Sequence, residues 1–143
     1  MTTPARPMPS AHTIYDDGTF RVGDIVVARV RNPQENSASR GKPRPFVLVR
    51  RADGHWCGMG LTTNPRYANG APRTPIPNVS AVGLVGAGFL WGSNMTYVSV
   101  LDIDRVIGHI ESSLAEAVIE LAGLCGPDEA ALRGAADRSF DAA

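Results

Sequence analysis

The order of apolar and polar residues predicts a chain that begins with short β-strands. Residues 22–30 (VGDIVVARV) are β-branched and almost entirely apolar, which is typical of a buried first strand. Residues 46–51 and 55–61 form two more apolar runs. The pair Asp53-Gly54 between them favours the positive backbone angles of a tight turn, so the two runs are expected to form a hairpin.

The middle of the chain alternates strands with two long polar loops. Residues 31–43 and 63–77 are longer than ordinary strand connections, and loops of that length in a compact domain are often functional. One or two strands are expected within residues 78–100, and a last one at residues 105–110. Fifteen Gly and eleven Pro supply the turns that such a pattern needs.

A single helix is expected after the last strand. Apolar residues recur at helical spacing from Leu114 to Cys125. Ser113, with Glu116 three residues later, has the pattern of a capping box, and Gly126-Pro127 is a typical helix end. Five to seven short strands followed by one helix favour a small, strongly bent barrel.

Length and composition indicate one domain with two tails. We expect a flexible arm at residues 1–18, a folded domain at residues 19–126, and a short helix or flexible tail at residues 127–143. The chain has no apolar run of the roughly 18–20 residues that a membrane span needs, and no secretory signal pattern. Cys57 and Cys125 have no metal-binding spacing, and we interpret them as reduced thiols of a cytoplasmic protein.

The charges are divided along a chain whose net charge is zero. Residues 29–73 hold nine of the fourteen Lys and Arg residues and only two acids, which gives that stretch a net charge of +7. Residues 74–143 hold three basic residues and nine acids, a net charge of −6. This division predicts one face that binds an anion.

Arg44 and Thr62 are the residues best placed to bind that anion. In a hairpin centred on Asp53-Gly54, paired positions have numbers that add to about 106, so Arg44 faces Thr62 at the open end. A guanidinium presents a planar set of donors that suits phosphate, and a hydroxyl beside it adds a hydrogen bond.

Four motifs carry a family resemblance over about residues 21–124. They are Gly23-Asp24-Ile25-Val26, Gly41-Lys42-Pro43-Arg44-Pro45, Leu61-Thr62-Thr63, and Val98-Ser99-Val100 through Ile107-Gly108-His109-Ile110. In these motifs the chain resembles the MazF/PemK family of toxins from bacterial type II toxin–antitoxin pairs. The resemblance implies a mainly β fold, a small SH3-like barrel of the CcdB/MazF type with a C-terminal helix.

The same resemblance implies an activity and partners. It predicts a cytoplasmic, metal-independent and sequence-specific endoribonuclease (an mRNA interferase) that needs no cofactor and cleaves single-stranded RNA. It also predicts a homodimer that is inhibited by a cognate antitoxin. The chemistry is consistent with few catalytic residues, because RNA carries its own nucleophile in the 2′-hydroxyl and the products are a 2′,3′-cyclic phosphate and a 5′-hydroxyl.

By resemblance, Arg44 and Thr62 match the catalytic Arg and Thr of the family. Several members have a Glu a few residues before the Gly-x-x-Arg-Pro element, where this chain has Ser37-Ala38-Ser39. The only acid in the loop is Glu35, nine residues before Arg44. The identity of the general base is therefore left open, and Glu35, or a second basic group such as Arg40 or Lys42, is expected to move the protons.

The remaining candidates are RNA-binding residues of the two long loops. They are Arg31, Arg40, Lys42, Arg66, Tyr67 and Arg73. The arginines and the lysine are expected to contact phosphates, and Tyr67 to stack on an unpaired base. The ordinary alternative for these residues, and for Arg44 and Glu35, is a solvated loop residue. For Thr62 it is a β-branched residue at a strand end.

Alternative interpretations remain at the level of site and function. His55 and His109 suggest a two-histidine ribonuclease, but their positions favour core or surface roles. Trp91 and Tyr97 could stack on unpaired bases, but aromatic residues in strands are usually core. A second class of function is a non-catalytic barrel toxin that acts by protein binding, as CcdB-like gyrase poisons do. A third is a degenerate homologue that keeps the barrel and binds an antitoxin without cleaving RNA.

Overall fold

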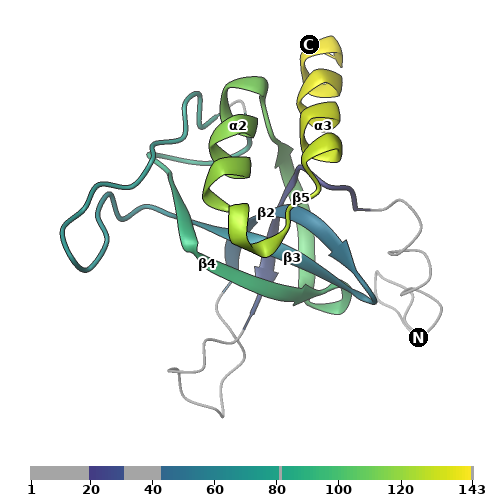
Figure 1. The fold of residues 1–143 in the computed structure, drawn as a ribbon, viewed down its shortest axis with the longest axis horizontal. Coiled ribbons are helices and arrows are strands. Elements are labelled where there is room, and N and C mark those ends of the chain that lie inside the picture. The colour runs from purple at the N-terminus through teal and green to yellow at the C-terminus, as the bar shows by residue number, and fades with distance from the viewer. Residues whose placement is uncertain (1–19, 31–42, 81, 143) are drawn as a thin grey trace.

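The computed structural model describes residues 20–30, 43–80 and 82–142. Its centre is one antiparallel sheet in the strand order β4-β3-β2-β1-β5 (Figure 1). The strands are β1 (Asp24–Arg29), β2 (Pro43–Ala52), β3 (His55–Thr62), β4 (Phe89–Ser99) and β5 (Ile103–His109). Two helices follow, α2 (Ser112–Leu121) and α3 (Glu129–Ala142), with short 3₁₀ turns η2 (Val100–Asp102) and η3 (Gly123–Cys125).

The hairpin of β2 and β3 has the expected register. Phe46 pairs with Gly60 and Leu48 with Gly58, so the residue numbers of each pair add to 106. The register shifts by one residue between Leu48 and Arg50, which is a β-bulge. Gly54 has a φ angle of 68° in the turn, as the Asp-Gly pair predicts.

Each face of the sheet covers its own apolar core. The inner core contains no residue of α2 or α3 and draws on every strand: Val26, Ala28, Phe46, Leu48, Trp56, Val98 and Ile103, joined by Phe20 and Val100. Because alternate residues of a strand point to opposite faces, Ile25, Val47 and Met59 belong instead to the core under the helices. A sheet that bends around one core and carries helices on the other is a small barrel, so the predicted mainly β barrel is confirmed.

Helix α2 begins earlier than predicted. The amide groups of Leu114 and Ala115 donate to the carbonyl oxygen of Glu111, at 2.9 and 3.0 Å. Glu111 is therefore the N-cap, and its side chain makes no capping hydrogen bond. The predicted capping box at Ser113 is wrong, because Ser113 already lies in the first helical turn.

The region predicted to hold one or two strands forms one strand, β4, of 11 residues, in agreement with that prediction. The end of α2 differs from the sequence pattern. Helix α2 ends at Leu121, five residues before Gly126, which has a φ angle of 71° and follows the 3₁₀ turn η3. Residues after Pro127, predicted as helix or tail, form the helix α3.

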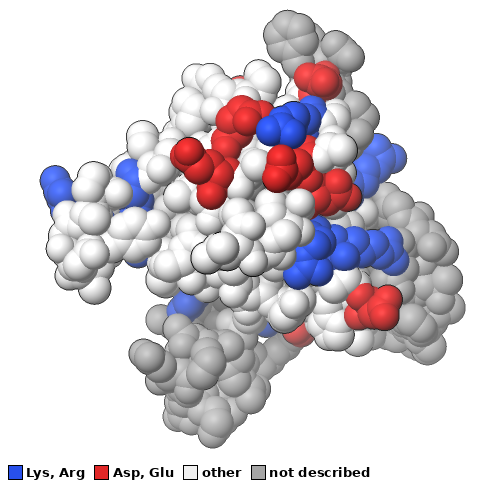
Figure 2. Space-filling model, viewed as in Figure 1, with Lys and Arg blue, Asp and Glu red and all other residues white. Residues whose placement is uncertain are grey.

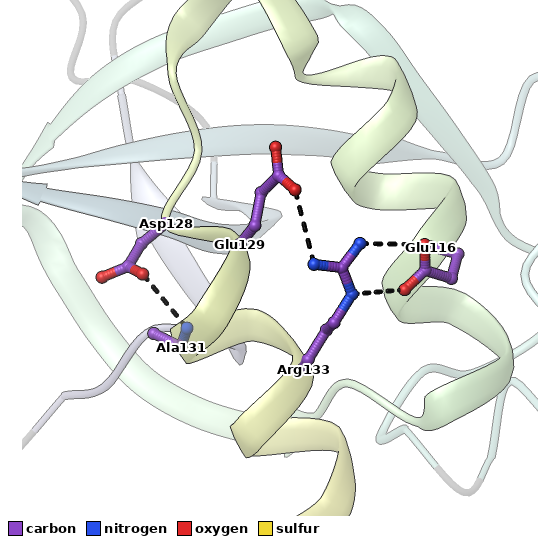
Figure 3. A network of polar contacts seen from close by, with 5 residues as sticks. All are labelled: Glu116, Asp128, Glu129, Ala131 and Arg133. Carbon is purple, nitrogen blue, oxygen red and sulfur yellow. Dashed lines mark hydrogen bonds and ion pairs between the residues drawn. The ribbon is translucent and has the colours of Figure 1, made fainter.

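Helix α3 is attached to α2 through Arg133 (Figure 3), and the residue that precedes it, Asp128, is bonded to the sheet. The Arg133 guanidinium donates to both carboxylate oxygens of Glu116, at 2.7 and 3.2 Å, and to Glu129 at 3.4 Å. Asp128 accepts a hydrogen bond from the Ala131 amide at 3.1 Å, which is an N-cap contact. Its own amide donates to the Val49 carbonyl of β2 at 2.9 Å. Among the described residues, no helix is long and apolar enough to cross a membrane.

Candidate functional site

A pocket of about 580 Å³ opens where β2 begins and β3 ends. Its lining comes from these two strand ends, from β4, and from the loop that precedes β4. The lining residues are Arg44, Pro45, Leu61, Thr62, Thr63, Leu84, Val85, Ala87, Gly88 and Trp91. The structure thus brings Arg44 and Thr62 to one site, as the hairpin register predicts.

The strand pairing explains this placement. Extending the Phe46–Gly60 register by two residues puts Arg44 opposite Thr62 at the open end of the hairpin. On their other sides, Arg44 pairs with Ala28 of β1 and Thr62 pairs with Phe89 of β4. Both side chains are half-buried, so each is held by the sheet and still reaches the pocket.

The Thr62 hydroxyl is oriented by the loop that follows it. Its oxygen accepts a hydrogen bond from the Asn64 amide at 3.1 Å. A hydroxyl has one proton to donate and two lone pairs, so this contact uses a lone pair and leaves the proton for another acceptor. Thr62 is therefore suited to donate to an anionic oxygen beside Arg44.

The loop that forms the far wall of the pocket is seated on β5 through two glycines. Gly83 has a φ angle of 89°, and a Cβ at this position would collide with the Ile107 carbonyl. A Cβ at Gly108 would likewise collide with the Val82 carbonyl. Leu84 and Val85, which follow directly, line the pocket. Backbone-to-backbone contact thus fixes the position of this wall.

The loop between β3 and β4 is organised around Arg73, which the sequence predicts to contact RNA. Arg73 is only 8% exposed. Its Nη1 donates to the carbonyls of Asn64 and Arg66, each at 2.8 Å, and its guanidinium lies 4.5 Å from the ring centre of Tyr67 and 5.0 Å from that of Trp91. We therefore assign Arg73 to holding this loop rather than to direct contact with RNA.

The other predicted RNA-binding residues differ in where they lie. Arg66 is exposed, and its Nη1 donates to the Gly70 carbonyl at 2.9 Å. Tyr67 is half-buried, with its ring under Arg73. The remaining candidates lie outside the described residues: Arg31, Glu35, Arg40 and Lys42.

Neither of the two histidines considered above belongs to the pocket lining. His55 is exposed at the turn end of the hairpin, where its Nδ1 lies 2.8 Å from the Asp53 carbonyl. His109 lies 2.9 Å from the buried Asp24 carboxylate, at the end of β1 remote from the Arg44–Ala28 pair. Burial raises the pKa of Asp24, and its contacts with the Arg21 amide and with His109 act in the opposite direction.

Both cysteines are free thiols. Cys57 is buried in β3, and Cys125 is half-buried in η3. Burial, together with the neighbouring Cys57 thiol, raises the pKa of Cys125 to about 11. The Cys125 thiol therefore stays protonated at neutral pH and is a poor nucleophile.

Trp91 is the pocket residue that the sequence pattern misassigns. The pattern favours core positions for Trp91 and Tyr97, whereas the structure places Trp91 in the pocket lining and leaves Tyr97 60% exposed. The pairing of β3 with β4 shifts between Met59 and Gly60, which pair with Met95 and Trp91. This irregularity depends on contacts across the sheet, so no local pattern indicates it.

Comparisons with known proteins place the fold. No protein-family model and no curated protein sequence matches the chain. Among solved structures, the Mycobacterium tuberculosis toxin MazF-mt6 is similar, with a TM-score of 0.50 and 22% identity over 70% of this chain and 96% of that one. A second structure, that of an Mtb toxin, aligns with 58% of this chain and 92% of its own length at 22% identity, with a lower TM-score of 0.46. The chain therefore has the fold of the MazF-type toxins.

Proposed function

We propose that this chain is the toxin of a type II toxin–antitoxin pair, an endoribonuclease that cleaves single-stranded RNA at specific sequences without a metal ion. The observation that carries the proposal is that Arg44 and Thr62 line one pocket on a MazF-type fold. These are the two residues that match the catalytic pair of the resembling family.

The pocket chemistry suits attack by the ribose 2′-oxygen on the adjacent phosphorus. In this step the 2′-O–P bond forms and the P–O5′ bond breaks, one proton leaves the 2′-hydroxyl, and another is delivered to the 5′-oxygen. The phosphorane between these events carries additional negative charge, which Arg44 stabilises. Thr62 donates its free proton to a non-bridging oxygen and fixes the phosphate in line.

Proton transfer needs a group that neither Arg44 nor Thr62 supplies. Glu35, or a second basic group such as Arg40 or Lys42, would move the protons, and the sequence leaves this choice open. A carboxylate has a reference pKa near 4 and is ionised at neutral pH, so it can accept the 2′ proton. Arg31, Arg40, Lys42 and the exposed Arg66 contact the RNA backbone in this proposal.

The proposed assembly is a cytoplasmic homodimer with an antitoxin as its inhibitor. Four large apolar side chains stay exposed in the described part of the monomer: Val85, Tyr97, Leu101 and Leu124. A two-fold dimer would cover part of this surface and bring two basic stretches to one RNA strand. An acidic, partly disordered antitoxin segment would compete for the same site by charge and occupancy.

Incubation of the purified protein with mixed-sequence single-stranded RNA in EDTA tests the proposed function. Cleavage at a restricted set of sites, unchanged by chelator, is expected, and a double-stranded RNA of the same sequence should stay intact. A requirement for added divalent metal would overturn the mechanism. Intact RNA under all conditions, with retained binding of an antitoxin, would support the non-catalytic alternative.

A further inference from the structure

Trp91 shares its pocket with the two residues proposed to hold phosphate. It lies in β4 and pairs with Gly60 of β3, at the point where the register of the two strands shifts by several residues. Bulges of this kind redirect side chains and are frequent beside functional sites. Gly60 leaves space that the Asn94 side chain fills, so a larger residue at position 60 would disturb the bulge. The indole is thus directed to the pocket by a defined irregularity of the sheet.

The Trp91 indole is in contact with Arg73. The Arg73 guanidinium lies 5.0 Å from the centre of the Trp91 ring and is fixed by two carbonyl oxygens at 2.8 Å. Its backbone amide also donates to the Pro65 carbonyl at 2.9 Å. A cation over an aromatic face is attractive, most strongly for Trp, and this contact limits rotation of the ring.

The charge of Arg73 adds to the field of the pocket. Among the described residues, no carboxylate forms an ion pair with Arg73, and its buried Nε has no hydrogen-bond partner. Two carbonyl dipoles and two aromatic faces stabilise the cation without cancelling its charge. Because the surroundings exclude water, that charge acts over a longer range than it would in solvent.

The shape of the pocket fits a nucleotide. Its volume of about 580 Å³ lies in the ordinary range of small-ligand sites, roughly 300–1,000 Å³. The other lining side chains include the apolar Pro45, Leu61, Leu84 and Ala87. An aromatic wall next to an Arg–Thr pair matches the two features that an unpaired nucleotide offers, a flat base and a phosphate.

We infer that Trp91 is a base-stacking platform of this pocket. The pocket takes one unpaired nucleotide, whose base stacks on the Trp91 indole while its phosphate lies at Arg44 and Thr62. Arg73 is a positioning residue that orients the indole and adds positive charge beside it. This role replaces the one predicted for Tyr67, which does not line the pocket. The inference rests on the proposed function for the identity of the polymer, but nucleotide binding does not require cleavage.

Fluorescence of the native indole tests the platform directly. The chain has two tryptophans, and Trp56 is 3% exposed in the inner core, so a Trp56→Phe variant reports on Trp91 alone. Titration with uridine 5′-monophosphate or adenosine 5′-monophosphate should quench this emission in a saturable way. Ribose 5-phosphate, which has the phosphate and sugar but no base, should leave it unchanged.

Binding of a non-cleavable strand gives the matched measurement. With a 2′-O-methyl RNA oligonucleotide, Trp91→Leu should weaken the dissociation constant by roughly tenfold, and Trp91→Phe by less, because stacking on an aromatic ring typically contributes that much per base. The control is Trp56→Phe, which replaces the other tryptophan, buried in the inner core and outside the pocket lining, and should bind as the parent does.

The outcomes separate this inference from the proposed function. If nucleotides quench the Trp91 emission but the protein cleaves no RNA, the stacking role of Trp91 is supported and the proposed ribonuclease activity is contradicted. A different result would overturn only the stacking role of Trp91. In that case the protein cleaves RNA, nucleotides leave the Trp91 emission unchanged, and the Trp91→Leu variant binds the oligonucleotide as tightly as the parent does.

Discussion

Arg133 and Arg73 differ in whether nearby carboxylates neutralise their positive charge. Arg133 of α3 lies at the surface, with two oxygens of Glu116 and one of Glu129 around it (Figure 3). Arg73, beside the pocket, is buried against carbonyl groups and aromatic rings. The first charge is cancelled by carboxylates and the second is not.

The same contrast extends to the surroundings of each arginine. Residues 111–137, which span α2 and much of α3, hold six acids and one arginine, and Figure 2 shows acidic side chains gathered over this face. Residues 43–73 hold five arginines and one acid. The net charge of zero is therefore the sum of an acidic helical side and a basic segment that includes the strand end at Arg44.

Arg44→Ala should have the largest effect on the pocket side. Loss of one preorganised stabiliser of developing charge typically lowers the rate by about 10²–10³-fold, so cleavage should become nearly undetectable. Arg51→Ala is the control, because Arg51 lies on the same strand at the turn end and outside the pocket lining. If the Arg44→Ala variant cleaves RNA at the parent rate, the pocket is not the catalytic site.

Glu35 gives the next test, of the proton-transfer step. Because Glu35 is one of several candidates for moving the protons, Glu35→Gln should lower the cleavage rate by less than about tenfold, a modest share of what general-base catalysis usually supplies. A collapse of the rate in this variant alone would make Glu35 the sole base. The pH profile of single-turnover cleavage measures the change.

Replacement of Thr62 should cost less than that of Arg44. Thr62→Val keeps the shape but removes the hydroxyl, and a neutral hydrogen bond of about 1 kcal/mol corresponds to roughly a fivefold change in rate. Thr62→Ser should stay near the parent, since it retains the donor and the contact to Asn64. Equal losses in both variants would point to packing rather than to the hydroxyl, as measured by single-turnover cleavage.

Arg73 should act on binding rather than on the chemical step. Arg73→Leu should raise KM several-fold, about what a desolvated cation–π contact contributes, with kcat little changed. Arg73→Lys keeps the charge and should restore part of the affinity. A loss confined to kcat, or no rescue by Lys, would contradict the positioning role; steady-state kinetics on a defined RNA measure both constants.

The salt dependence of RNA affinity should distinguish the basic region from the acidic helical region, and the expected change is the smallest of those predicted. The logarithm of RNA affinity should fall linearly with that of salt concentration, with a slope of about −0.7 per phosphate neutralised. Arg66→Ala should make the slope shallower by about that amount, while Arg133→Ala should leave it unchanged. A flat salt response in the parent protein would separate the basic stretch from RNA binding.

The hairpin was predictable from the sequence because its determinants are local. Asp53-Gly54 fixes the turn, and the alternation of burial fixes the register, so the sequence alone places Arg44 and Thr62 together. The bulge later in β2 does not disturb this, since it lies between Leu48 and Arg50, on the turn side of the pair.

The rest of the site depends on contacts between distant segments. The far wall of the pocket is set by the approach of Gly83 to β5, and Trp91 is directed by an irregular pairing with β3. The burial of Arg73 requires both Tyr67 and Trp91. Helix α2 starts from the Glu111 carbonyl instead of the Ser113 pattern, because backbone contacts outweigh a local capping signal.

The chemical identity of the cleaved ends tests the central claim most directly. In the Arg44–Thr62 pocket, the 2′-hydroxyl of the RNA should be the nucleophile. Products formed in EDTA should therefore carry a 2′,3′-cyclic phosphate and a 5′-hydroxyl. Kinase labelling of the 5′ ends without prior phosphatase treatment, together with mass analysis of the 3′ ends, measures both. Ends that carry a 5′-phosphate and a 3′-hydroxyl would contradict the account, because water rather than the ribose would then be the nucleophile.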